Sequence, residues 1–124
     1  MPIRGIRGAT TATTNTSDAI MDATRELLQT IVKINDICAD DVASAIFTLT
    51  PDLDAAFPAS AARALGWTHV SLLDTSAPDV EKDLPRCIRV LIHWNTKRAQ
   101  QDISHVYLHD ARTLRPDLAK DKRP

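Results

Sequence analysis

The run Cys87-Ile88-Arg89-Val90-Leu91-Ile92-His93-Trp94 decides the fold of this chain. An almost continuous apolar stretch of this length predicts a central strand that is covered on both faces. Arg89 interrupts the apolar pattern, and a cation in such a strand must reach water, pair with an acid or meet an anionic ligand. A second run, at 3–11, has the same property because Arg4 and Arg7 interrupt it. The sequence therefore predicts two strands that carry cations.

Helices and further strands are predicted around these two runs. Apolar residues recur at helical spacing up to about residue 35, after the capping sequence Asn15-Thr16-Ser17-Asp18, and predict the longest helix. Pro58 suits the first position of a second helix, and Gly66 suits its end. We expect the remaining strands at 44–50, 69–73 and 104–108, short helical turns at 40–41 and 100–103, and a loop at 75–85.

The order of the predicted elements is β-α-β-α-β-β-β, with one long helix. This order predicts an α+β (α/β-like) fold in which a mixed five-stranded sheet is packed with helices. The length predicts one domain, residues 1–118, followed by a flexible C-terminal tail at 119–124. One main helix leaves a face of the sheet partly bare, so we expect a closed homo-oligomer that covers it.

Charge and composition exclude several classes of protein. The chain has 124 residues, with 15 Lys and Arg against 16 Asp and Glu, a balance that gives no footprint for nucleic acid or a membrane surface. No window suits a signal peptide or a transmembrane span, so we expect a cytoplasmic protein. Cys38 and Cys87 fit two reduced thiols, and a disulfide between them stays open.

No sequence motif indicates a metal or a nucleotide cofactor. His105 and His109 are four residues apart in an expected strand, where about 13 Å would separate them, too far to share one metal ion. The chain has no Gly-x-Gly-x-x-Gly before a helix and no Gly-x-Ser-x-Gly elbow. We therefore expect no metal site and no cofactor.

Three arginines, Arg7, Arg63 and Arg89, indicate a basic pocket for a small dianion. Each also has a plainer interpretation. Arg7 could belong to an edge strand, Arg63 to a solvated helix face, and Arg89 could pair with a carboxylate along the sheet. Likewise, Tyr107 fits a half-buried strand aromatic, and Asp74 fits the turn chemistry at the end of a strand.

Several motifs together closely resemble the monofunctional, AroH-class chorismate mutases, in order and with near-constant spacing. These motifs are Arg4-Gly5-Ile6-Arg7-Gly8-Ala9-Thr10-Thr11, Thr24-Arg25-Glu26-Leu27-Leu28, Thr50-Pro51-Asp52-Leu53, Ala56-Phe57-Pro58-Ala59, Arg63, Cys87-Ile88-Arg89-Val90, His105-Val106-Tyr107-Leu108 and Leu114-Arg115-Pro116-Asp117-Leu118. The resemblance covers almost the whole chain. It implies a homotrimer with a pseudo-α/β-barrel core and three active sites at subunit interfaces. It also implies the cofactor-free Claisen rearrangement of chorismate to prephenate, in phenylalanine and tyrosine biosynthesis.

The same resemblance implies a role for each site residue. Arg89 would be the main catalytic residue, donating to the ether oxygen of chorismate, while Arg7 and Tyr107 would hold a carboxylate. The resemblance implies that one subunit supplies Phe57, which packs on the substrate, and Arg63, which helps close the site. Its neighbour would supply Arg7, Asp74, Arg89 and Tyr107. Further substrate contacts are expected from Leu73 and from a mobile C-terminal segment containing Leu114 and Arg115.

The chain departs from the family pattern at the position of a glutamate. Ala77 stands there, and Asp74 stands where the family often has cysteine. Our hypothesis is that Asp74 supplies the missing carboxylate, since an electrostatic role requires a nearby charge more than one fixed geometry. Asp79 is a weaker substitute because it lies two residues beyond Ala77. Ser60 replaces a family lysine, which predicts only a small loss of attraction for the dianion.

Two other functions stay open at this point. The loss of the glutamate is compatible with a catalytically silent trimer that binds chorismate, or regulates, without rearranging it. A trimeric enamine deaminase-like protein would have a similar architecture and an interfacial arginine, but the matching terminal motifs argue against it. Turnover of chorismate, binding without turnover, or neither would separate the three functions.

Overall fold

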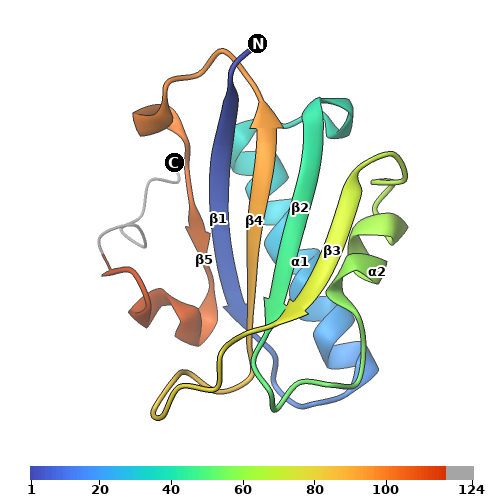
Figure 1. Cartoon of the computed structure of the whole chain (residues 1–124), viewed down its shortest axis with the longest axis vertical. Coiled ribbons are helices and arrows are strands. Elements are labelled where there is room, and N and C mark those ends of the chain that lie inside the picture. Colours follow the sequence, from blue (N-terminus) through green and yellow to red (C-terminus); the bar gives the residue numbers. More distant parts are fainter. Residues whose placement is uncertain (117–124) are drawn as a thin grey trace.

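A computed structural model describes residues 1–116, which form one mixed five-stranded sheet with helices on one side (Figure 1). The strand order is β3-β2-β4-β1-β5. β4 pairs antiparallel with both β1 and β2, whereas β2 with β3 and β1 with β5 are parallel pairs. The strands are β1 (Ile3–Thr11), β2 (Val42–Leu49), β3 (Ser71–Ser76), β4 (Cys87–Asn95) and β5 (Val106–Tyr107). The predicted α+β class and mixed five-stranded sheet are confirmed, and the expected tail at 119–124 lies outside the described residues.

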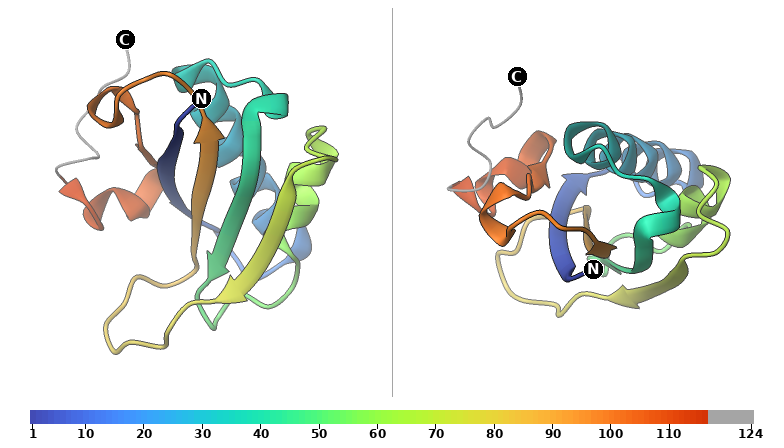
Figure 2. Two further views of the ribbon diagram at one scale, coloured as in Figure 1. Left: turned by 45° about the horizontal axis from the view of Figure 1, so that its top comes forward. Right: turned by 90° about the horizontal axis from the view of Figure 1, so that it is seen from above.

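Two helices, α1 (Ser17–Asn35) and α2 (Pro58–Ala64), cover the same face of the sheet, which curves around them in Figure 2. Short 3₁₀ turns complete the fold at η1 (Ala39–Asp41), η2 (Gln100–Asp102) and η3 (His109–Thr113). Within residues 1–116, no helix has both the length and the apolar character that crossing a bilayer requires.

Helix α1 begins and ends where its capping residues predict. The Thr16 hydroxyl accepts a hydrogen bond from the Ala19 N–H at 3.2 Å, and Asp36 ends the helix in the left-handed conformation at φ 57°. Its apolar side lies directly on β1 at Gly8. A Cβ atom built there would lie 2.7 Å from Ile31 Cδ1, so only glycine allows the helix to pack this closely on the strand.

The two faces of the sheet have different surroundings. Val90, Ile92 and Phe47 point toward the helices into the main hydrophobic core, and we call this side the helix face. Because side chains alternate along a strand, Arg89 and Leu91 point to the other side, the open face. Leu91 is 38% exposed there. The prediction that β4 is covered on both faces is therefore wrong for the single chain, and the expectation of a partly bare face is confirmed.

The bounds of two strands differ most from those predicted. The strand expected at 69–73 is β3, at Ser71–Ser76, because its hydrogen bonds to β2 run from Ser71 to Ser76. The strand expected at 104–108 shortens to β5, because only Val106 and Tyr107 pair with β1. Both limits depend on pairing with residues far away in the sequence, which local composition does not encode. His105 and His109 thus lie outside any strand, contrary to the assumption behind their expected separation.

Candidate active site

Arg7 and Arg89 lie on the open face of neighbouring strands and line one cavity of about 560 Å³. In the pairing of β1 with β4, Ala9 is opposite Arg89 and Arg7 is opposite Leu91, so the two arginines are diagonal neighbours. The volume lies in the range of small-molecule sites. The cavity is lined by Arg7, Gly8, Ala9, Ile46, Thr48, Ala77, Pro78, Arg89, Val90, Leu91, Tyr107, Leu114 and Arg115.

Tyr107 reaches this cavity from β5, where it pairs with Ala9 of β1. It belongs to a small buried cluster with Ala9, Cys87 and Ala111. Leu114 packs against the same cluster, just after η3. This packing brings Leu114 and Arg115 to the cavity wall, where the sequence predicts a segment over the mouth of the site.

His105 supports the Arg7 strand in a way that the sequence did not reveal. Its Nδ1 atom accepts a hydrogen bond from the backbone N–H of Arg7 at 2.9 Å. The ring therefore takes the place of a strand carbonyl, one residue before β5 begins. An imidazole nitrogen accepts only when it is unprotonated, so this contact requires the neutral ring in the tautomer with hydrogen on Nε2. No local sequence signal indicates such a contact between residues 98 positions apart.

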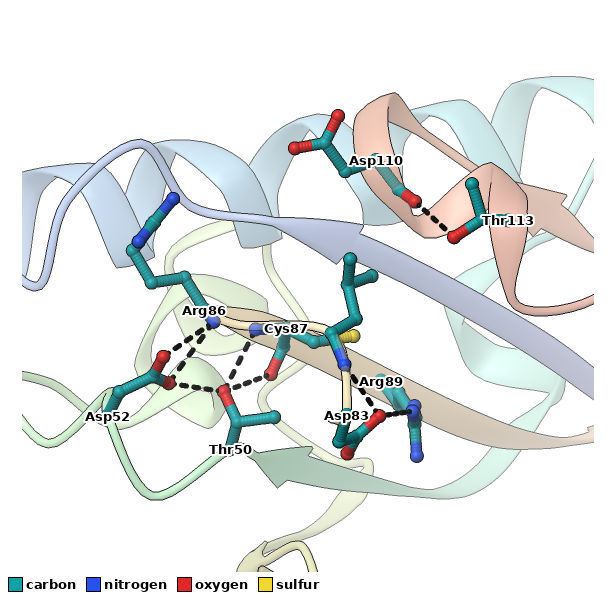
Figure 3. A network of polar contacts seen from close by, with 9 residues as sticks. Thr50, Asp52, Asp83, Arg86, Cys87, Arg89, Asp110 and Thr113 are labelled. Carbon is teal, nitrogen blue, oxygen red and sulfur yellow. Dashed lines mark hydrogen bonds and ion pairs between the residues drawn. The ribbon is translucent and has the colours of Figure 1, made fainter. Parts of the chain in front are cut away.

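Arg89 has an acidic partner that sequence reasoning also missed. Its Nη2 lies 3.3 Å from Oδ1 of Asp83, in the loop between β3 and β4 (Figure 3). The Cys87 thiol lies on the same face beside the guanidinium. Burial raises the pKa of this thiol, and the charge of Arg89 and a hydrogen bond from it act in the opposite direction. The thiol therefore stays neutral near Arg89, and Asp83 supplies the negative charge.

The other predicted site residues do not line this cavity. Phe57 precedes α2 and is 69% exposed, while Leu73 on β3 is 59% exposed. Arg63 lies on the exposed side of α2, where its Nη2 is 3.4 Å from the Ser60 hydroxyl. Phe57 and Arg63 belong to the α2 segment beside β3, where Asp74 points to the helix face and Leu73, paired with Ile46, points to the open face. Arg7, Arg89 and Tyr107 also lie on the open face, at the cavity.

Asp74 lies at the β3 edge of the sheet, away from the cavity that Arg7, Arg89 and Tyr107 line. It pairs with Phe47 and shares the helix face, where Oδ1 accepts a hydrogen bond from the Ala59 N–H at 3.0 Å. Burial raises the pKa of Asp74, against the opposing effects of the Ala59 N–H and the Arg63 charge. Within one chain the Asp74 and Arg89 side chains therefore point to opposite faces of the sheet, and the expectation that one subunit supplies both to the same site stays a prediction.

The cavity is basic and lacks the groups of an acid–base or nucleophilic site. Ala77, at the position of the expected glutamate, lines it, and none of its described lining residues is acidic. Residues 1–116 also contain no group of three His, Cys, Asp or Glu side chains placed to hold a metal ion. The three guanidinium groups of Arg7, Arg89 and Arg115 and the phenol of Tyr107 suit a different task, which is to bind and orient an anion by charge-assisted hydrogen bonds.

Comparison with known proteins identifies the family of this fold and site. The family model described as chorismate mutase type I matches residues 3–118. Chorismate mutase AroH of Thermus thermophilus is 50% identical over 94% of this chain and 96% of its own length. The AroH protein of Bacillus subtilis (strain 168) is 43% identical over 98% and 97%. A chorismate mutase structure from Clostridium thermocellum has a TM-score of 0.87 at 49% identity, covering 88% of this chain and 97% of that one.

Proposed function

The chain belongs to the type I chorismate mutase family of isomerases, and we propose that it rearranges chorismate to prephenate at sites shared between subunits. The observation that carries this proposal is the cavity in which Arg7, Arg89 and Tyr107 converge without an acidic neighbour in its lining. Chorismate has two carboxylates. Arginine holds such groups well because its planar guanidinium offers paired N–H donors at a fixed spacing.

The chemistry requires few functional groups. The rearrangement breaks one C–O bond while it forms one C–C bond, with no proton transfer and no nucleophile. The enzyme must fold the enolpyruvyl arm over the ring, which is a task of orientation. It must also stabilise negative charge that develops toward the ether oxygen. In our proposal Arg89 donates to that oxygen, and Arg7 and Tyr107 hold a carboxylate.

We propose that each site has two halves from different copies of the chain. The cavity half consists of Arg7, Arg89 and Tyr107, with Leu114 and Arg115 at its wall. The edge half consists of Phe57, Arg63, Leu73 and Asp74. The exposure of apolar residues supports a second copy as the covering partner, since Phe57, Leu73 and Leu91 are 69%, 59% and 38% exposed. In a homotrimer, threefold symmetry would generate three equivalent contacts of this kind.

Asp74 supplies, in this proposal, the carboxylate that Ala77 does not. The edge half brings it to the cavity of the neighbouring copy, where it accepts a hydrogen bond from the ring hydroxyl and places negative charge beside the ring. Its contact with the Ala59 N–H holds it at the start of α2, close to Phe57 in the chain. Its raised pKa predicts that activity falls, with decreasing pH, earlier than an ordinary aspartate would allow.

The experiment that tests this function follows the loss of chorismate's ultraviolet absorbance, in metal-free buffer, for wild type and Asp74→Asn. We expect turnover by wild type, about ten- to hundredfold slower turnover by the variant, and an acid limb that only wild type shows. Asp79→Asn, which changes an exposed carboxylate on the next loop, is the matched control and should equal wild type.

The outcomes separate the candidate functions. Equal turnover by wild type and Asp74→Asn would contradict the role of Asp74 and leave the mutase function in place. Chorismate that binds to wild type without turnover would favour the silent-trimer function instead. The absence of both binding and turnover would contradict the proposed function itself.

A further inference from the structure

The ion pair between Asp83 and Arg89 places an acidic group directly behind the proposed catalytic cation. Asp83 does not line the cavity, whereas Arg89 does. The Asp83 side chain is 24% exposed and that of Arg89 is 38% exposed, so water only partly screens the pair. Figure 3 shows the Asp83 carboxylate between the guanidinium and the backbone of its own loop.

The backbone fixes the Asp83 carboxylate in place. The same oxygen that meets Arg89, Oδ1, also accepts the N–H of Leu84 at 2.8 Å. Leu84 itself packs against the buried cluster of Ala9, Cys87 and Tyr107 at the cavity wall. Asp83 is therefore attached to the packed wall of the cavity and is not a freely rotating loop residue.

Hydrogen bonds hold both ends of the loop that carries Asp83. The Ala77 N–H donates to the Leu49 carbonyl at 2.8 Å where the loop begins. The Arg86 N–H donates to the Asp52 carboxylate at 2.9 Å where the loop ends (Figure 3). Inside the loop, the Asp83 N–H donates to the Val80 carbonyl at 3.1 Å. These contacts limit how far Asp83 can move relative to β4.

An arginine side chain in the absence of such a partner rotates about several bonds, and ordering it costs conformational entropy. The guanidinium has five N–H donors in one plane, so an acceptor that binds one Nη fixes the direction of the others. Asp83 binds Nη2 from the loop side, which leaves donors of the same plane for the cavity.

We propose that Asp83 is a positioning residue for the rearrangement: it orients the Arg89 guanidinium toward the bound substrate and does not itself contact that substrate. This inference rests on the proposed function. Because Asp83 orders a group used mainly in the transition state, its loss should lower kcat more than it raises KM.

The variants Asp83→Asn and Asp83→Ala test this role. Asparagine keeps an oxygen that can accept from the Leu84 N–H and removes only the charge. The loop should therefore keep its conformation in Asp83→Asn. We expect kcat to fall about tenfold in Asp83→Ala and less in Asp83→Asn, with KM changed by less than about twofold. Glu81→Gln, on the same loop but exposed, should match wild type in both constants.

A double-mutant cycle separates positioning from a general effect on structure. In an Arg89→Ala background there is no guanidinium to orient, so Asp83→Ala should cause no further loss of kcat. A tenfold loss in both backgrounds would overturn the proposal, because Asp83 would then act through the fold. A rise in kcat/KM for Asp83→Ala would also overturn it, since Asp83 would then compete with the substrate for Arg89.

A spectroscopic measurement tests the same inference without turnover. In ¹⁵N NMR spectra of the side chains, a fixed guanidinium gives separate Nη signals, which merge when it rotates freely. We expect separate Arg89 signals in wild type and merged signals in Asp83→Ala. Merged signals in wild type would overturn the positioning role even if chorismate is turned over. If wild type gave separate signals but did not turn over chorismate, the proposed function would be wrong, whereas the conclusion that Asp83 orders the Arg89 guanidinium would stand.

Discussion

The cavity half and the edge half of the proposed site are built in opposite ways. In the cavity half, Arg89 is half-buried, paired with Asp83 and supported by a buried cluster at the base of the sheet. In the edge half, Phe57 and Leu73 are exposed, and the Arg63 guanidinium lies 3.4 Å from the Ser60 hydroxyl on the exposed side of α2. The cavity half is preorganised within one chain. The edge half presents exposed apolar side chains, Phe57 and Leu73, that do not pack within that chain. The contrast supports the proposal that assembly completes the site.

The largest expected effect comes from removing the cation of the cavity half. Arg89→Ala deletes a donor used mainly in the transition state, so kcat should fall by about 10²–10³ or more. The fall in kcat is measured by following chorismate's ultraviolet absorbance at saturating substrate. A neutral citrulline at position 89 would then separate the contribution of charge from that of hydrogen bonding.

Arg25→Ala is the matched control for Arg89→Ala. Arg25 is paired with Asp22 at 2.9 Å on the exposed side of α1, away from the cavity. Its variant should retain wild-type kcat, because an exposed ion pair of this kind contributes little. If Arg89→Ala retained more than about a tenth of wild-type kcat, the transition-state role given to Arg89 would be wrong.

Mixing two inactive variants tests whether the halves come from different chains. We would unfold and refold Arg89→Ala together with the double variant Arg63→Ala/Asp74→Asn in equal amounts. Random assembly of a trimer pairs an intact cavity half with an intact edge half at about a quarter of the sites, so about a quarter of wild-type activity should return. Each variant refolded alone is the control. Mixed samples that stay inactive would place both halves of each site in one chain.

Gly8 links the cavity floor to the helix behind it. In Gly8→Ala the new Cβ would lie 2.7 Å from Ile31 Cδ1 and 3.1 Å from Val90 Cγ1. Overpacking of this kind should lower the free energy of unfolding by about 1–3 kcal/mol. Gly5→Ala is the control on the same strand, since its Cβ would meet Leu91 Cδ1 at an ordinary 3.5 Å. Urea denaturation compares the two, and equal midpoints would contradict this account of the packing.

The smallest expected effect is at Asp52, which holds the end of the Asp83 loop. Burial acts to raise its pKa, but hydrogen bonds from the Thr50 hydroxyl and the Arg86 N–H outweigh it, so the pKa is lowered. The ionised group therefore stabilises the fold at neutral pH, and this stabilisation is lost as pH falls through the lowered pKa. Because Asp52 is exposed, Asp52→Ala should cost less than about 1 kcal/mol.

The pH dependence of unfolding checks the role of Asp52. Denaturant midpoints of wild type and Asp52→Ala should differ at neutral pH and approach each other in acid. A difference that stays constant down to strongly acidic pH would show that the carboxylate charge is not the cause. Asp54→Ala, in the same segment, serves as the control, with the Asn15 amide as the donor to its carboxylate.

Local patterns in the sequence predicted the strands that carry Arg7 and Arg89, because the cations interrupt clear apolar runs. The sequence also predicted the cap before α1, where Thr16 lies, and the start of α2 at Pro58. The sequence did not predict the bounds of β3 and β5, because hydrogen bonds to strands distant in the sequence set them. The family motifs indicated the residues of the proposed site, but not that Asp74 points to the face that α2 covers.

Sequence alone was enough to predict the class of the fold, the family and the strands that carry Arg7 and Arg89, because periodicity, capping and motif spacing are local properties of the chain. Which of these groups meet depends on the tertiary structure. Strand register put Arg7 beside Arg89 and turned Asp74 to the opposite face. Loop packing brought Asp83 to Arg89, a contact that depends on how the chain folds back and not on any spacing within it.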